Sequence, residues 1–146
     1  MKAAKGSGKE KPAGKAGKAP LVLVVDDFAD NRDMYARFLE FSGFRAEQAS
    51  NGQEALDKAF AERPDLVVMD LSLPGLDGWE ATRRLKADAR TKDVPVVAVT
   101  GHALEGSREN AKKAGCDGYI AKPCLPIDLV SEIKRVLGSG RRGRDK

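Results

Sequence analysis

Short, uninterrupted apolar runs alternate with amphipathic segments along the central part of the chain. The runs at 21–25 (LVLVV), 66–69 (LVVM) and 96–99 (VVAV) are rich in β-branched residues. Such runs are typical of strands that are buried on both faces of a parallel sheet. Weaker strand candidates lie at 44–48 and 119–121. The pattern therefore predicts five short strands.

Helical segments with apolar residues at three- and four-residue spacing follow these strands. They are predicted at about 30–42, at 53–63, from 78 onward, at 104–114 and at 126–137. Gly43 provides a C-terminal stop for the first helix, and Asn51 stands in capping-box spacing with Glu54 at the start of the second. Strict alternation of strands and helices implies right-handed crossovers, so we expect a parallel sheet with helices on both faces.

The composition changes at both ends of the chain. Residues 1–20 carry six lysines and one glutamate among small residues and prolines, so we expect this segment to be disordered. Residues 138–146 (GSGRRGRDK) form a second basic tail that we also expect to be disordered. The whole chain has a net charge of +4, so residues 21–137 form a mildly acidic domain between basic tails.

Length and composition limit the possible classes of function. The 146 residues suit a single domain. No apolar run approaches the ~18–20 residues of a membrane-spanning helix, and no secretory signal is evident, so we expect a cytoplasmic protein without a membrane partner. Cys116 and Cys124 are too few for a disulfide framework and lack the spacing of a zinc site.

Polar side chains of complementary chemistry stand directly after four of the predicted strands. Asp26 and Asp27 follow the first strand, and Asp70 follows the third. Thr100 follows the fourth strand and Lys122 follows the fifth. Open parallel sheets bind ligands beyond the carboxyl ends of their strands, so we expect these residues to meet. One aspartate after a strand is ordinary turn chemistry, but four such strand ends together are difficult to attribute to turns.

Three carboxylates with an ammonium and a hydroxyl group suit phosphoryl transfer. Crowded carboxylates form a hard oxygen site for Mg²⁺. An ammonium and a hydroxyl can bind the phosphoryl oxygens, while one carboxylate attacks phosphorus to form a mixed anhydride. We assign the attack to Asp70, which stands alone at the centre of the sheet, and metal binding to the paired Asp26 and Asp27.

The order and spacing of these motifs resemble the response regulator receiver family of two-component signalling. The resemblance covers about residues 21–137 and rests on Asp26-Asp27, MDLSLPGLDG at 69–78, Val99-Thr100 and YIAKP at 119–123. Within the family, the chain is most similar to single-domain receivers of the cell-cycle, polar-differentiation type. The resemblance implies an α/β, flavodoxin-like, doubly wound (βα)5 fold whose five-stranded parallel sheet has the order 2-1-3-4-5.

The resemblance also implies roles for the matching residues at the metal and phosphate site. Asp70 would be the phosphoacceptor. Mg²⁺ would be held by the carboxylates and by one backbone carbonyl, from Asp26, Asp27, Asp70 and Ser72. Thr100 would bind one phosphate oxygen and Lys122 another.

Other matching residues would act on the response to phosphorylation. Tyr119 would be the switch aromatic that turns inward when Thr100 moves, and Pro123 would follow a cis peptide bond that places the lysine. Ser72 and His102 would modulate the lifetime of the phosphate. For His102, the only histidine, an exposed loop position without a role is the alternative interpretation.

The implied function is that of a stand-alone response regulator, a signalling switch rather than an enzyme. A sensor histidine kinase or a histidine phosphotransfer protein would donate the phosphoryl group. An output protein would bind the surface of the fourth helix, fifth strand and fifth helix. The fourth helix has Leu104 as its single large apolar residue, and Gly106 weakens it by ~1 kcal/mol, so we expect it to be weakly held and to shift on phosphorylation.

Other functions fit the residues less well. Phosphatases with an aspartyl-phosphate intermediate usually have a second acid two residues after the nucleophile, where this chain has Ser72, and a cap domain. A nucleotide- or flavin-binding protein needs a glycine- or hydroxyl-rich loop after the first strand, where the sequence is Asp26-Asp27-Phe28. The basic tails can attract nucleic acid weakly and nonspecifically, but they lack interleaved aromatic residues for base stacking.

Overall fold

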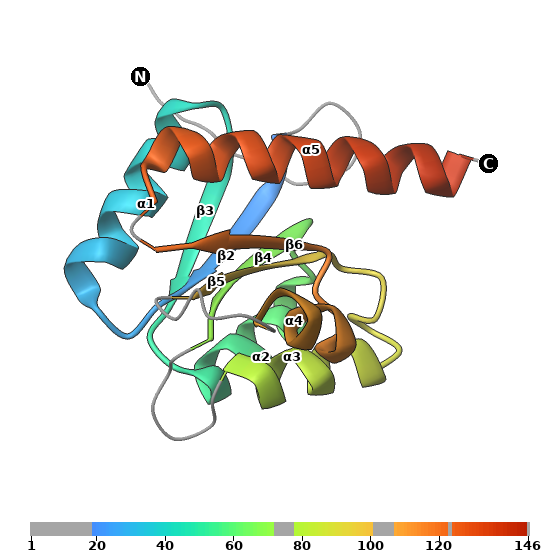
Figure 1. Cartoon of the computed structure of the whole chain (residues 1–146). Helices are drawn as coiled ribbons and strands as arrows, with labels where there is room; N and C mark the ends of the chain where they lie inside the picture. The colour runs from blue at the N-terminus through green and yellow to red at the C-terminus, as the bar shows by residue number, and fades with distance from the viewer. Residues whose placement is uncertain (1–18, 72–77, 101–106, 123, 146) are drawn as a thin grey trace.

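The computed structural model describes residues 19–71, 78–100, 107–122 and 124–145. Five parallel strands form one sheet with helices on both faces, as the sequence predicts (Figure 1). The strands are β2 (Leu21–Val25), β3 (Arg45–Ala49), β4 (Leu66–Asp70), β5 (Val96–Thr100) and β6 (Gly118–Ala121). Their spatial order is β3-β2-β4-β5-β6, which is the predicted 2-1-3-4-5 topology.

The helices divide into two layers (Figure 1). One face of the sheet is covered by α1 (Ala29–Phe41) and α5 (Pro126–Asp145), and the other by α2 (Gly52–Glu62), α3 (Gly78–Ala87) and α4 (Ser107–Ala114). The last helix differs from the predicted boundary, because it continues past Leu137 to Asp145. Once a helix has formed, adding each further residue changes its free energy only slightly. In the segment after Leu137, arginines favour the helical state and glycines disfavour it.

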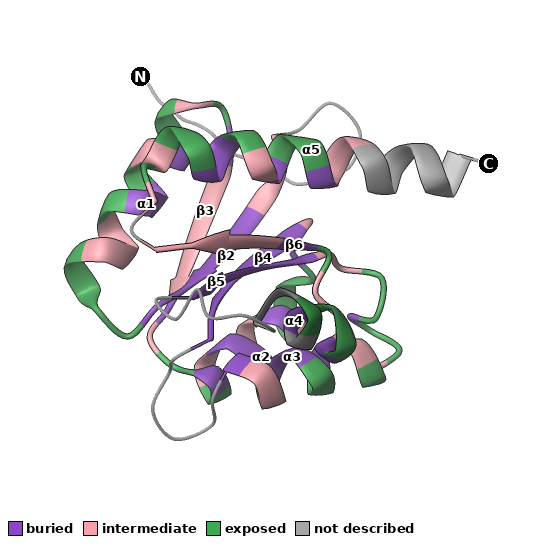
Figure 2. Ribbon diagram, viewed as in Figure 1, coloured by how far each residue is buried: buried purple, intermediate pink, exposed green. Residues whose placement is uncertain are grey.

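Buried side chains form one hydrophobic cluster on each face of the sheet (Figure 2). On β2, Leu23 and Val25 face α2, α3 and α4, whereas Val22 and Val24 face α1 and α5. All five residues of β4 and of β5 are buried. The uninterrupted apolar runs in the sequence therefore reflect central strands that contribute to two cores at once.

The helix stop predicted after α1 and the helix cap predicted at the start of α2 are both present. Gly43, just beyond α1, has a φ of +101°, a left-handed conformation that favours glycine. The Asn51 side chain accepts a hydrogen bond from the backbone N–H of Glu54 at 2.8 Å. Glu54 in turn accepts from the backbone N–H of Ser50 at 2.8 Å and from its hydroxyl at 2.9 Å. The capping box is thus present, with its return bond one residue earlier than the usual position.

Charged side chains from the helices cover the two edge strands of the sheet. At β3, the Lys58 ammonium donates to the backbone carbonyl of Gln48. At β6, the Glu132 carboxylate accepts from the backbone N–H of Tyr119 at 3.3 Å. Gly118 makes room for Glu132, because an added Cβ would lie 2.7 Å from its Oε2. Exposed strand edges are sites of unwanted pairing, and these contacts occupy backbone groups at both edges.

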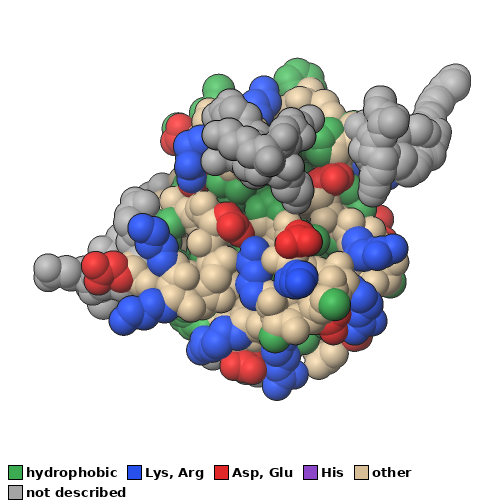
Figure 3. Space-filling model, turned by 90° about the vertical axis from the view of Figure 1, so that its right-hand side faces the viewer, with side chains coloured by type: hydrophobic (Ala, Val, Ile, Leu, Met, Phe, Trp, Pro, Cys, Tyr) green, Lys and Arg blue, Asp and Glu red, His purple; other side chains and the backbone are tan. Residues whose placement is uncertain are grey.

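The surface carries charges of both signs. Figure 3 shows basic and acidic side chains interspersed on the face opposite the strand ends that carry the aspartates. Lys86 pairs with Asp117 at 2.9 Å, and Arg90 pairs with Asp88 at 2.8 Å. Among the described residues, none of the helices is both long and apolar enough for a membrane span.

Candidate functional site

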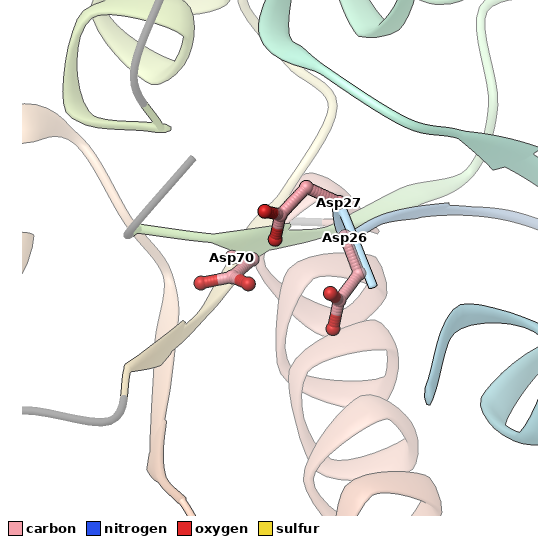
Figure 4. A group of neighbouring side chains, drawn as sticks. All are labelled: Asp26, Asp27 and Asp70. Carbon is pink, nitrogen blue, oxygen red and sulfur yellow. The ribbon is translucent and has the colours of Figure 1, made fainter. Parts of the chain in front are cut away.

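The carboxyl ends of β2 and β4 place three aspartates side by side (Figure 4). Asp26 and Asp27 directly follow β2, and Asp70 is the last residue of β4, its neighbour in the sheet. Carboxylate oxygens of the three residues lie within 4.8 Å of one another. Asp26 and Asp70 are 3% and 2% exposed, whereas Asp27 is exposed. The group is therefore buried at its base and open to solvent on one side.

Two further strand ends complete the site. Lys122 follows β6, and its ammonium lies 3.2 Å from Asp70 Oδ2 and 3.6 Å from Asp26 Oδ2. The backbone N–H of Lys122 donates to the carbonyl of Thr100, the last residue of β5, at 2.7 Å. Thr100 is 5% exposed. Parallel strands bring these residues to one edge of the sheet although almost a hundred positions separate the first from the last.

The surroundings of two charged groups in this site, Asp26 and Lys122, raise their pKa values. Burial raises the pKa of Asp26, and the carboxylates of Asp70 and Asp27 raise it further. The backbone N–H of Phe28, which donates to Asp26 at 2.9 Å, and the Lys122 ammonium act in the opposite direction. Burial disfavours the charged form of Lys122, but its attraction to Asp70 and Asp26 prevails, so the pKa of Lys122 is raised.

The donor set fits a hard divalent cation. Three carboxylates face a single ammonium, so the described part of the site holds excess negative charge in a mostly buried position. Oxygen ligands at this spacing match the preference of Mg²⁺, which also retains water molecules, and the exposed Asp27 leaves room for them. Asp26, Asp27 and Asp70 are the described residues that would hold the ion.

Helix α1 supports the acidic end of β2 through a residue that sequence reasoning missed. The Arg32 guanidinium donates to the backbone carbonyl of Asp26 at 2.8 Å and to the Gln48 side chain at 3.0 Å. It thereby links the strand end that carries the aspartates to the neighbouring strand β3. An arginine in the first turn of a helix that follows an acidic pair was the available signal in the sequence.

The remaining candidates differ in how far the structure describes them. Tyr119 lies on β6, is half-buried and packs against the cluster that faces α2, α3 and α4. A cavity of about 260 Å³ lies beside it, lined by residues of α4, β6 and α5. Three predicted site residues fall outside the described part of the chain: Ser72, His102 and Pro123.

The predicted fourth helix is described from Ser107 onward, so Leu104 and Gly106 are not among its described residues. The buried side chains on the described part of α4 are those of Ala111 and Ala114. In this described part, α4 therefore packs through small side chains.

Comparison with known sequences identifies relatives over most of the chain. Residues 22–134 match the family model of the response regulator receiver domain. The polar-differentiation response regulator DivK of Brucella anthropi is 39% identical over 117 residues, which cover 80% of this chain and 95% of DivK.

Solved structures with the same fold include receivers of different kinds. The chemotaxis response regulator CheY4 of Vibrio cholerae matches with a TM-score of 0.77 and 29% identity, over 82% of this chain and 99% of that one. The receiver domain of the sensor histidine kinase PA1611 of Pseudomonas aeruginosa matches with a TM-score of 0.76 and 35% identity, over 82% and 98%. That structure has a magnesium ion coordinated in its active-site cleft.

Proposed function

This chain belongs to the response regulator receiver family, a family of signalling switches, and we propose that it accepts a phosphoryl group on Asp70 in a Mg²⁺-dependent reaction. One observation carries the proposal. The Asp70 carboxylate lies at the meeting point of four strand ends, beside two further aspartates and 3.2 Å from the Lys122 ammonium. This combination supplies a nucleophile, a metal site and a cation for the phosphate at one place.

The residues divide the chemistry among them. An Asp70 oxygen forms the new bond to phosphorus while the bond from phosphorus to the donor nitrogen or oxygen breaks. Asp26, Asp27 and Asp70 would hold Mg²⁺, which would supply positive charge to neutralise the phosphoryl oxygens. Lys122 is released from part of its pairing with Asp70 and binds one of these oxygens, and the Thr100 hydroxyl binds another. Because Asp26 and Asp27 stay unmodified, they remain available to hold the metal.

The phosphodonor is a sensor histidine kinase or a histidine phosphotransfer protein. Asp70 is almost fully buried, so a donor has to approach along the edge where the strands end. Exposed apolar side chains border this edge: Phe28 is 56% exposed, Leu125 64% and Ile127 60%. Phe28 directly follows the aspartate pair, and Leu125 lies three residues after Lys122. Exposed apolar side chains of this kind support docking of a protein rather than a small metabolite.

Phosphorylation is read out by another protein that binds α4, β6 and α5. The cavity beside Tyr119 and the small side chains beneath α4 support this assignment, since both allow rearrangement at low free-energy cost. We propose further that the site assists hydrolysis of its own phosphate and that the protein acts in the cytoplasm.

The central test is chemical modification of purified protein with acetyl phosphate and Mg²⁺, measured by intact-protein mass spectrometry. We expect wild type to gain one phosphoryl group and Asp70→Asn to gain none. Asp57→Asn, on the exposed surface of α2, is the matched control and is expected to behave like wild type. Omitting Mg²⁺ is expected to prevent the reaction. Modification of the Asp70→Asn variant would contradict the proposal.

A further inference from the structure

A buried tyrosine on α1 contacts the segment that follows Lys122. The Tyr35 hydroxyl and the Cys124 thiol lie 3.3 Å apart and form a hydrogen bond between residues 89 positions apart in the sequence. Tyr35 is 4% exposed, and both side chains pack in the hydrophobic cluster that faces α1 and α5. The Tyr35 ring is therefore fixed by close packing, and its hydroxyl occupies a defined place.

The segment that carries Lys122 is held on two sides. On its N-terminal side, the backbone N–H of Lys122 donates to the Thr100 carbonyl of β5 at 2.7 Å. On its C-terminal side, Cys124 bonds to Tyr35 of α1. Beyond Lys122, the Cys124 side chain therefore has a hydrogen bond to α1 in addition to its packing against the hydrophobic cluster.

The helix that supplies this hydroxyl is itself tied to the acidic half of the site. Arg32, one turn before Tyr35, donates to the backbone carbonyl of Asp26 at 2.8 Å. A single face of α1 thus contacts both the strand end that carries Asp26 and the segment that carries Lys122.

We propose that Tyr35 is a positioning residue for phosphoryl transfer, which acts through Cys124 to hold Lys122 where its ammonium meets the phosphoryl oxygens. This inference rests on the proposed function of Asp70. It follows because buried polar groups adopt placements that satisfy their hydrogen bonds, and because small displacements of a charged group from the reacting oxygens lower the rate of reaction.

The test uses the full chain with Tyr35→Phe, Cys124→Ala and the double variant. Phenylalanine keeps the buried ring and removes only the hydroxyl. We expect each single variant to slow phosphorylation of Asp70 by acetyl phosphate about 3–10-fold, the factor that corresponds to loss of one hydrogen bond. The double variant is expected to be no slower than the single variants, because both remove the same bond.

Three further measurements separate positioning from general damage. Mg²⁺ affinity, measured from the rise in unfolding temperature with added Mg²⁺, is expected to stay within about twofold of wild type, since the ligating carboxylates are untouched. Cys124→Ser is expected to recover part of the rate, because its hydroxyl can bond to Tyr35. Phe41→Leu, at a side chain of α1 that is 88% exposed, is the matched control and is expected to leave the rate unchanged.

The outcomes distinguish this inference from the proposed function. An unchanged rate in Tyr35→Phe, or additive losses in the double variant, would overturn the positioning role. Parallel losses of rate and Mg²⁺ affinity would also overturn it, because they indicate a general distortion of the site. Failure of wild type to be phosphorylated at Asp70 would instead overturn the proposed function.

Discussion

Helices α1 and α4 pack on opposite faces of the sheet, and they are attached to the rest of the protein in different ways. Helix α1 has 13 residues and buries Tyr35, Ala36 and Leu39, of which Leu39 is fully buried. The described part of α4 has 8 residues, and its described buried side chains are those of Ala111 and Ala114. The free energy gained by burying apolar side chains grows with their size, so we predict that α1 is held more firmly than the described part of α4.

The contacts with the site show the same difference. Through Arg32 and Tyr35, α1 bonds to the Asp26 carbonyl and to Cys124. Helix α4 borders the cavity of about 260 Å³ next to Tyr119, which gives side chains on that side space to rearrange. Under the proposed function, α1 would preserve the geometry needed for phosphoryl transfer, while α4 would change position in response to it. A switch built in this way could change shape without losing its reactive site.

The largest expected difference between the two helices is in their contribution to global stability. Leu39→Ala removes a fully buried side chain from α1 and is expected to lower the free energy of unfolding by about 2–5 kcal/mol. Ala111→Gly, its counterpart on α4, is expected to lower it by about 1–2 kcal/mol, from lost helix propensity and one buried methyl group. Urea unfolding measures both values. Equal losses would contradict the comparison.

Local opening provides a second test of the same difference. Backbone amides in the last turn of α4 are expected to exchange with solvent at least about tenfold faster than those of α1 around Leu39, because opening α4 exposes little apolar surface. Hydrogen–deuterium exchange with mass spectrometry measures this. Beryllofluoride with Mg²⁺, a mimic of the phosphorylated state, should change exchange in α4 more than in α1. Equal protection of the two helices in the free protein would remove the distinction.

The smallest expected effect is the change in the free energy of unfolding when the charge of Asp26 is removed. Burial and neighbouring carboxylates raise the folded-state pKa of Asp26, so ionisation of Asp26 favours the unfolded chain. Its contribution to stability is greatest in acid, below the unfolded pKa, and is lost as pH rises through the folded pKa. Asp26→Asn is therefore expected to stabilise the protein at pH 7, on the order of 1 kcal/mol, while keeping an oxygen acceptor for the Phe28 N–H.

Two controls make this third prediction specific. The advantage of Asp26→Asn should disappear as pH falls below the pKa of Asp26, where the wild-type carboxyl is protonated. Added Mg²⁺ should stabilise wild type more than the variant, because the variant lacks one anionic ligand. A variant that is less stable than wild type at pH 7 without Mg²⁺ would show that pairing with Lys122 outweighs burial and repulsion.

Much of the fold was predictable because its strongest signals are local. The run LVLVV at 21–25 is apolar at every position since β2 contributes to cores on both faces, and this is visible without any partner. The site residues were predictable for a related reason. Once the strands are parallel, the residues that end them must share one edge, and the structure does place Asp26, Asp70 and Lys122 there.

The contacts that support the site could not be predicted in the same way. Periodicity indicates that Tyr35 faces the core, but it does not identify Cys124 as its partner, because that contact depends on how α1 and α5 pack. The end of α5 was also misplaced. Glycines at 138, 140 and 143 indicate a break, whereas helical continuation from a firmly packed segment extends to Asp145.

The side chains that cover the sheet edges have a consequence for recognition in a crowded cell. An open strand binds extended segments through backbone groups alone, with little regard to their sequence. Lys58 and Glu132 occupy such groups at β3 and β6. Encounters that depend only on the backbone are thereby discouraged, and partners must be distinguished by side chains on the helices and loops. By covering its sheet edges, this protein therefore favours partners that recognise its side chains over partners that bind any open strand.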